Sequence, residues 1–327
     1  MKIENQKIVS TSMHMTGIAV IFVAVGVGLS TIVSIFDNRV DFFQLLLSTV
    51  ILIFVGSVLF KSSEFGATEQ DSIFTAVGTT WLVVSLLGTI PYLFVGTFSR
   101  AGIGLPEVFV DSLFESVSGF TATGSTVFGV HNSIQSQGSG ILIYRQLTQW
   151  MGGMGIVVLV VSVLPSLRAS GLGLIDAEAP GAGVERIAPR VVETAKKFWY
   201  IYVSLTILIA LGFFVFGMGL FDAIAHGLSA ASTGGFSTKD ISLGYWNSIT
   251  IEIVAMAGFL IAATNFTLHA RLIERKRFDY ASDSEFKSFI GVIFLGVLII
   301  TLLLNSEGFS FGSSLRNASF NVITLAT

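Results

Sequence analysis

Two short segments of this chain combine glycine with threonine and serine in a pattern that could coordinate a dehydrated cation. The first reads SVSGFTATG over residues 116–124, and the second reads SAASTGGFS over residues 229–237. Backbone carbonyls can replace the hydration shell of a cation without a fixed charge that would trap it. Glycine takes a positive φ at no steric cost, so successive carbonyls can turn toward one axis. This is the chemistry of ion conduction.

Both segments occur in the same setting. Each follows a long apolar stretch and a short apolar helix, expected at residues 106–120 and 219–231, and another long apolar stretch comes next. A helix of about 12 residues is too short to cross a membrane, so we predict re-entrant loops. A third copy begins at residues 319–327, where the sequence stops. Aligning Gly124 with Gly234 gives a repeat of roughly 100 residues.

A simpler interpretation has to be weighed against this one. A Thr-Gly pair after an apolar helix is also an ordinary helix end, in which the glycine caps the last turn. For either segment alone we would prefer that interpretation. Two copies at equivalent positions, with a third beginning, favour a pore. One loop cannot surround an ion, whereas four loops, or two from each of two chains, can.

The composition determines the class of protein. Of the 327 residues, 52% are hydrophobic and 12% are charged, and the mean hydropathy is +0.80. A soluble domain carries about 25% charged residues. This composition excludes a cytosolic enzyme and a disordered chain, and the net charge of −3 argues against nucleic acid as a partner. There is no cysteine for a disulfide or a thiolate metal site. We therefore expect an all-α, polytopic membrane protein.

Seven stretches are long and apolar enough to cross a membrane. They cover residues 15–36, 42–60, 74–96, 141–164, 198–216, 249–268 and 286–304. If the N-terminus is inside, thirteen of the 18 Lys and Arg residues lie on the cytoplasmic side. The remaining five are Arg39, Arg100, Arg145, Lys239 and Arg316. The positive-inside rule therefore predicts a cytoplasmic N-terminus.

At this point the sequence resembles a known family. The segment 116–124 and the following QWMGGMGI (149–156) resemble the first repeat of the TrkH/KtrB superfamily of potassium uptake proteins. The segment 229–237 is similar to the second filter loop of that family, and NFTLHA (265–270) and SEF (284–286) also fit. The resemblance covers essentially the whole chain. Two extra spans before the first repeat make it more like the TrkH branch.

The resemblance implies span–pore helix–span repeats around one cation pore, four in the family, with potassium as the transported ion. It implies two extra helices over 1–65, the first repeat over 66–170, the second with a cytoplasmic linker over 171–278, and an incomplete third over 279–327. We interpret the chain as the N-terminal part of a longer transporter. The implied partners are a second copy (a homodimer), a cytoplasmic TrkA-like nucleotide-binding regulatory ring and the lipid of the cytoplasmic (inner) membrane. Neither a cofactor nor an enzymatic activity is implied.

The resemblance also assigns the ion-coordinating backbone. We expect filter carbonyls from three consecutive residues in each loop, with K⁺ held at the first two positions of each; turn geometry alone is the alternative. These residues are Ala122, Thr123 and Gly124 in the first repeat and Ser232, Thr233 and Gly234 in the second.

Charged residues beside the loops are candidates for pore support. Arg145 lies in the outer turn of a span, where charge is costly and usually paired. Its candidate partners are Glu115 and Asp111, and snorkelling to the interface is the alternative. Glu252 could attract cations at the outer mouth or could serve as a hydrogen-bonded structural carboxylate. The basic run 271–277 could contact lipid headgroups or dock the regulatory ring.

Three alternative functions remain to be weighed, and a group of glycines predicts one packing face. A secondary transporter of another small solute would also have repeats and broken helices, but no inverted repeat is visible. A Na⁺-permeable member of the same superfamily is the second alternative. An intramembrane hydrolase lacks support, because no Ser-His pair at matching depth is recognisable in the sequence. Gly152, Gly153 and Gly155 predict close helix packing.

Overall fold

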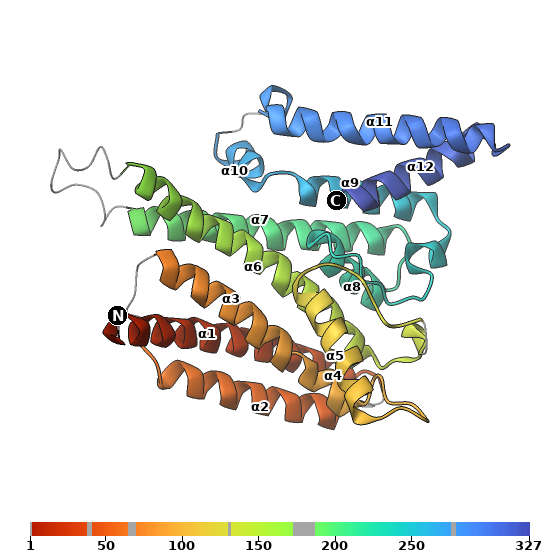
Figure 1. Ribbon diagram of the computed structural model, residues 1–327. Helices are drawn as coiled ribbons and strands as arrows, with labels where there is room; N and C mark the ends of the chain where they lie inside the picture. The colour runs from red at the N-terminus through yellow and green to blue at the C-terminus, as the bar shows by residue number, and fades with distance from the viewer. Residues whose placement is uncertain (1, 38–40, 65–69, 130–131, 173–186, 276–278) are drawn as a thin grey trace. The chain divides into compact units, whose positions relative to one another are not determined.

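The computed structural model describes residues 2–37, 41–64, 70–129, 132–172, 187–275 and 279–327 (Figure 1). Every regular element assigned within these ranges is a helix, as the sequence predicted. The chain forms two compact units, and each is described by itself. The first unit holds Met1–Ala195 and Phe236–Ser242, and the second holds Lys196–Gly235 and Leu243–Thr327.

The first unit is a helical bundle around α1. Its helices are α1 (Lys2–Ser34), α2 (Phe42–Lys61), α3 (Gln70–Leu87), α4 (Thr89–Val95), α5 (Leu105–Phe120) and α6 (Ser139–Leu172). Helix α1 packs along α2, α3 and α6, and the short α5 packs against α3, α4 and α6 (Figure 1). This arrangement sets α5 beside the span that follows it in the chain.

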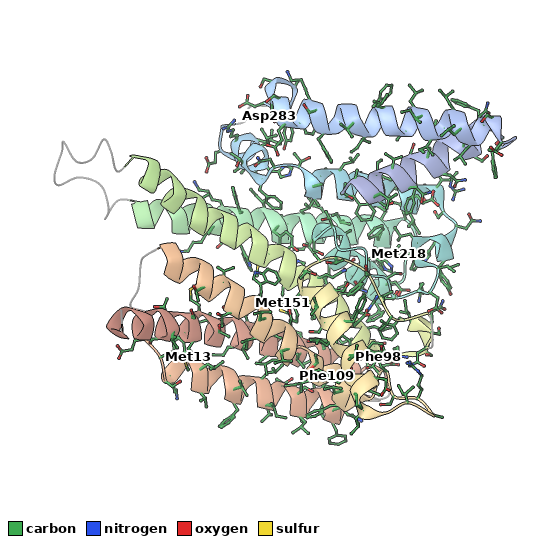
Figure 2. All side chains as sticks on the ribbon, in the orientation of Figure 1. Met13, Phe98, Phe109, Met151, Met218 and Asp283 are labelled. Atoms are coloured by element: carbon green, nitrogen blue, oxygen red, sulfur yellow. The ribbon has the colours of Figure 1, made fainter. Side chains whose placement is uncertain are left out.

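Small residues allow the helices around α1 to approach closely. A Cβ on Gly17 would lie 2.6 Å from the backbone nitrogen of Phe60 and 2.9 Å from the carbonyl oxygen of Gly56. Met151 on α6, labelled in Figure 2, lies on another contact of α1, where a Cβ on Gly26 would come within 3.2 Å of its sulfur. Contacts of this kind depend on the absence of side chains, which is the usual basis of packing between membrane helices.

The predicted span at 74–96 is interrupted at Gly88, between α3 and α4. A Cβ on Gly88 would lie 2.5 Å from side-chain atoms of both Phe120 and Ser116 on α5. The hydroxyl of Tyr144 donates to the Gly88 carbonyl at 2.8 Å. The interruption therefore lies where α3 and α4 pack directly on α5, which a larger residue would prevent.

The second unit contains the later helices. They are α7 (Ile187–Val215, of which residues from Lys196 belong to this unit), α8 (Leu220–Ala231), α9 (Ile249–Ala263), α10 (Phe266–Arg275), α11 (Ser284–Ser306) and α12 (Phe311–Ala326). Helix α8 lies so close to α7 that a Cβ on Gly227 would come within 2.6 Å of the Cβ of Ala210. Helix α12 packs against α9 and α11.

The short apolar helices are confirmed. Helix α5 has 16 residues and α8 has 12, with bounds within a residue of those expected. In the described part of the chain, five helices are long and apolar enough to cross a membrane, and the bent pair α9–α10 is a sixth candidate. The predicted span at 141–164 lies in α6, whose side chains after residue 155 are outside the described set.

One predicted span is wrong in shape. The sequence suggested a continuous helix over 249–268, but α9 ends at Ala263 and α10 continues at an angle of 90°. Thr264 has extended backbone (ψ 143°), which stops α9. The side-chain oxygen of Asn265 then accepts the N–H of Thr267 at 3.0 Å and starts α10. Hydropathy does not register this local polar chemistry.

Candidate functional site

Helix α5 ends in a Schellman motif that shapes the loop after it, residues 121–124, which we call the first loop. Thr121 caps the helix, the N–H of Ala122 donates to the Gly119 carbonyl, and the N–H of Thr123 donates to the Ser118 carbonyl, both at 2.9 Å. The C-terminal end of the α5 dipole, worth about half a negative charge, thus lies next to this loop. That end of a helix favours a cation.

Helix α8 ends in the same way, and residues 232–235 form the second loop. Ser232 caps the helix, the N–H of Thr233 donates to the Ala230 carbonyl at 3.1 Å, and the N–H of Gly234 donates to the Ser229 carbonyl at 2.9 Å. The two loops therefore correspond hydrogen bond by hydrogen bond. Two helix ends with corresponding hydrogen bonds at equivalent places in the chain support a shared function.

The backbone angles correct the register expected from the sequence. The positive φ values fall on Ala122 (52°) and Gly124 (79°) in the first loop, and on Thr233 (51°) and Gly235 (83°) in the second. Gly124 therefore corresponds to Gly235, and the alignment of Gly124 with Gly234 is wrong by one residue. The second segment contains two adjacent glycines, Gly234 and Gly235, and sequence spacing does not reveal which of them takes the left-handed conformation.

The loops hold strained backbone where helix ends usually place glycine. A residue with a Cβ in the left-handed region costs about 1–2 kcal/mol, and a β-branched residue such as Thr233 is a clear outlier there. Such strain gathers at functional sites. Along the first loop the sign of φ alternates, from −84° at Thr121 to +52° at Ala122 and, after Thr123, to +79° at Gly124. Alternation of this kind turns successive peptide groups, so that their carbonyls can serve one cation.

Glu115 on α5 organises the segment that leaves the first loop. Its side chain is fully buried, and each carboxylate oxygen lies 2.9 Å from the hydroxyl of Thr126. It also accepts the N–H of Val127 at 3.2 Å and the Nε–H of Arg145 at 2.5 Å. One carboxylate thus joins α5, the segment beyond the loop and the next span, α6.

Arg145 on α6 completes this group of contacts. Its side chain is 1% exposed, and its Nη1 donates to the carbonyl of Ser237 at 2.7 Å. The guanidinium lies 3.6 Å from the ring centre of Phe236 and 5.3 Å from that of Phe128. We call Glu115, Arg145 and the groups they bind the buried clamp.

The other charged candidates have different partners. Asp111 forms its ion pair with Arg100 at 3.2 Å, on a part-exposed surface. Glu252 is held by Arg316, whose Nε and Nη2 each donate to a different carboxylate oxygen at 2.7 Å. A carboxylate in a bidentate pair with arginine has its charge compensated. For Glu252 the geometry favours the structural interpretation over cation attraction at an outer mouth.

Sequence reasoning missed several residues of this site. Gly235, Thr126 and Gln149 all contact or form the two loops or the segments after them. The adjacent glycines at 234 and 235 were a signal for the first of these. Gln149 lay inside the quoted motif, but its role depends on a contact between residues 87 positions apart, which spacing does not predict.

Long apolar helices alternate with short helices that end in cation-suited loops. This fold and this site define a polytopic membrane protein built from span–pore helix–span repeats. The family model TrkH, described as "Cation transport protein", matches residues 42–323. The chain belongs to the TrkH family.

Known proteins are similar over most of the chain. A Trk system potassium uptake protein TrkH of Halomonas elongata is 40% identical over 252 residues, which are 76% of this chain and 50% of that protein. TrkH of Escherichia coli K12 is 38% identical over 280 residues, or 84% and 56% of the two chains. The crystal structure of the potassium transporter TrkH from Vibrio parahaemolyticus superposes with a TM-score of 0.82 at 30% identity. The match covers 97% of this chain and 64% of the chain in that structure. The chain spans about half the length of the curated relatives it matches.

Proposed function

We propose that the protein is the translocating subunit of a potassium uptake system, in which K⁺ passes a filter of backbone carbonyls. The observation that carries this proposal is the bond-by-bond correspondence of the two loops, each at the C-terminal end of a short helix. The two relatives described above are both Trk system potassium uptake proteins, which agrees with the proposal. Backbone carbonyls suit K⁺ because they replace its hydration shell without fixed charge.

The proposed filter extends the set expected from the sequence by one glycine. Its members are the backbone carbonyls of Ala122, Thr123, Gly124, Ser232, Thr233, Gly234 and Gly235. Ala122 and Thr233 supply strained backbone, and Gly124 and Gly235 supply the second positive φ in each loop. Glu115 and Arg145 support the filter through the buried clamp. Asp111 supports the outer end of α5 through Arg100.

The wider assembly follows from the resemblance and belongs to the proposal. The protein acts as a homodimer in the cytoplasmic membrane, with its N-terminus inside, on a cytoplasmic TrkA-like nucleotide-binding ring. Two extra helices over 1–65 precede repeats over 66–170, 171–278 and 279–327. It transports K⁺ without a cofactor and catalyses no chemical reaction. A Na⁺-permeable pore and a transporter of another solute are the competing functions.

Growth at low K⁺ tests the proposal. The full-length gene product is expressed in a bacterial strain that lacks its own K⁺ uptake systems, and rescue of growth is expected. Gly124→Ser should weaken the rescue, because it adds a Cβ in the filter at φ 79°. Gly129→Ser is the matched control, since Gly129 has φ 83° with open space around it and lies outside the loop. No rescue by parental protein that is present in the membrane would overturn the proposal.

A further inference from the structure

The segment Phe236–Ser242 follows the second loop directly in the chain, yet it packs within the first compact unit, where Phe236 lies close to α5 and α6. A peptide bond joins Gly235, the last residue of the second loop, to Phe236. Whatever holds Phe236 therefore also acts on the end of the second loop.

Gln149 on α6 holds the first residue of this segment. Its Oε1 accepts the N–H of Phe236 at 3.1 Å. The side chain of Gln149 is 0% exposed and that of Phe236 is 2% exposed. One helical turn earlier on α6, Arg145 lies over the Phe236 ring and donates to the carbonyl of Ser237. Two consecutive residues after the second loop are thus fixed to α6.

The far end of the segment is held as well. The carboxylate of Asp240 accepts the hydroxyl of Ser133 at 2.5 Å and the N–H of Ile134 at 2.6 Å. Both donors lie in the connection between the first loop and α6. The segment is therefore attached to the first unit at both ends, which limits how far Phe236 can shift.

The segment after the first loop is held by α5, the helix that precedes the loop. Ser118 of α5 donates to the carbonyl of Ser125 at 2.5 Å, and Glu115 of α5 accepts from Thr126. In the corrected register, the place of Glu115 on α8 is taken by His226, whose Nδ1 pairs with the Asp222 carbonyl within the same helix. At this position α8 therefore carries an imidazole where α5 carries a carboxylate.

Peptide geometry links the Gln149 contact to the orientation of the Gly235 carbonyl. The N–H of Phe236 and the C=O of Gly235 belong to one planar peptide unit, and no described peptide bond is cis. In a trans peptide these two groups point in opposite directions. Holding the N–H toward Gln149 therefore aims the Gly235 carbonyl away from the Gln149 amide.

We propose that Gln149 is a positioning residue for the second loop, because it fixes the orientation of the Gly235 carbonyl from a helix of the preceding repeat. This inference rests on the proposed filter function. Ion preference contributed by the second loop then depends on α6. Loss of the Gln149 acceptor frees the Gly235–Phe236 peptide to rotate, so ion preference weakens although the fold persists.

The test compares two equally buried glutamines on one helix. Gln149→Met keeps the size of the side chain and removes the acceptor, whereas Gln149→Glu keeps an acceptor oxygen. Gln146→Met is the matched control, since Gln146 is also 0% exposed and neither of its amide atoms has a hydrogen-bond partner in the described part of the chain. The readout is Rb⁺ uptake with Na⁺ as competitor, in the full-length protein.

We expect Gln149→Met to lower the Rb⁺/Na⁺ preference at least fivefold, Gln149→Glu to recover part of it, and Gln146→Met to change it less than twofold. Parental preference in Gln149→Met, or an equal loss in Gln146→Met, would overturn the inference. If Gln149→Met does not reach the membrane, Asp240→Ala releases the other end of the segment and should lower the preference in the same direction. An unchanged preference in Asp240→Ala would count against the inference.

A second readout separates this inference from the proposed function. Amide hydrogen exchange of a peptide that begins just before Phe236 does not require transport. The Phe236 amide should exchange at least tenfold faster in Gln149→Met than in the parent or in Gln146→Met. If the parent moves no Rb⁺ but exchange rises as expected, the filter proposal fails and the anchor stands. If exchange is unchanged, the anchor itself is wrong.

Discussion

Arg145 and Glu115 form an ion pair that water does not reach, with side-chain exposures of 1% and 0%. The pair survives burial because each partner has further hydrogen-bond partners: Thr126 and Val127 for the carboxylate, and Ser237 for the guanidinium. Burying two charges is costly, and additional hydrogen bonds offset that cost. The pair therefore joins α5 and α6 to two further segments, one at Thr126 and Val127 and one at Ser237.

Removing either partner should strongly destabilise the protein. Arg145→Met or Glu115→Gln leaves a buried group uncompensated, which costs about 3–5 kcal/mol for a broken buried pair. Arg100→Met is the control, because the Arg100–Asp111 pair is 25% and 21% exposed and exposed pairs contribute about 0–1 kcal/mol. Thermal unfolding of the full-length protein in detergent measures both. Equal shifts in melting temperature for the two pairs would contradict this account.

Exchanging the two charges should not restore the protein. In the double variant Arg145→Glu with Glu115→Arg, the N–H of Val127 would face a donor and the carbonyl of Ser237 would face a carboxylate. Neither new neighbour can make the lost hydrogen bond. We expect membrane abundance and Rb⁺ uptake in the double variant to remain as low as in the worse single variant. Recovery to half the parental uptake would mean that the ion pair alone matters.

Asp41, which immediately precedes α2, should make stability depend on pH. Burial raises the pKa of this carboxyl; the hydrogen bond from the Ile141 N–H lowers it in part, and the nearby charge of Asp37 raises it further. A raised folded-state pKa means that the associated stability is complete below the unfolded pKa of about 3.9 and is lost as pH rises through the folded pKa. The charged form of Asp41 therefore destabilises the folded protein at neutral pH.

Asp41→Asn should raise the melting temperature at pH 7 by on the order of 2 °C, and the gain should vanish near pH 4. Asparagine keeps a carbonyl oxygen for the Ile141 N–H and carries no charge. Asp41→Leu removes the acceptor and should lower the melting temperature at both pH values, because a buried N–H is left unpaired. A lower melting temperature for Asp41→Asn at pH 7 would show that the charge stabilises the start of α6.

Local patterns in the sequence predicted most of the helices and one pair of interacting charges. Apolar length determines a span, and the short apolar runs before the loops gave α5 and α8 within a residue. The Arg145–Glu115 contact could be predicted because a charge at that depth needs a partner, and Glu115 lies on the preceding helix. These inferences need only composition, spacing and the cost of burying charge.

The remaining features depend on conformation and distant contacts. Hydropathy does not distinguish a straight helix from α9 and α10, which meet at 90° after Thr264 turns extended. Glycine spacing aligned Gly124 with Gly234, whereas the hydrogen bonds at the end of α8 and the positive φ values align it with Gly235. The Gln149–Phe236 contact joins residues 87 apart, which only the folded arrangement brings together.

Gly152 and Gly155 lie on the same apolar helix but should respond differently to alanine. A Cβ on Gly152 would lie 2.0 Å from the carbonyl oxygen of Phe120, the last residue of α5, so α5 or α6 has to shift. We expect a loss of about 1–3 kcal/mol from overpacking and weaker Rb⁺ uptake. A Cβ on Gly155 would make an ordinary contact of 3.7 Å with Trp81. Gly155→Ala should therefore be neutral or stabilising, since alanine favours helix by about 1 kcal/mol.

Thermal unfolding and Rb⁺ uptake of the two alanine variants check this difference. Their order should be the same in both measurements, with Gly152→Ala below the parent. If Gly155→Ala proved the more damaging of the two, the close contact between α6 and the end of α5 would not be the one that matters.

Alanine variants of Gly235 and Gly217 form a matched pair that tests whether Gly235 belongs to the proposed filter. Both have positive φ, 83° and 107°, and a Cβ on either would meet nothing within 4 Å. Alanine at each position should therefore cost a similar amount of stability, about 1 kcal/mol from the left-handed backbone alone. Only Gly235 lies in the second loop, where in the proposed filter a small rotation of one peptide would change the number and direction of the carbonyls around an ion.

We expect both variants to reach the membrane and to lose similar amounts of thermal stability. Gly235→Ala should also lower Rb⁺ uptake in the presence of competing Na⁺ by roughly a factor of ten, which corresponds to about 1.4 kcal/mol of lost ion preference. Gly217→Ala, in the turn between α7 and α8, should keep the parental preference. An equal loss in both variants would mean that strain anywhere near α8 disturbs transport. Unchanged preference in Gly235→Ala would remove this glycine from the filter and favour the register based on Gly234.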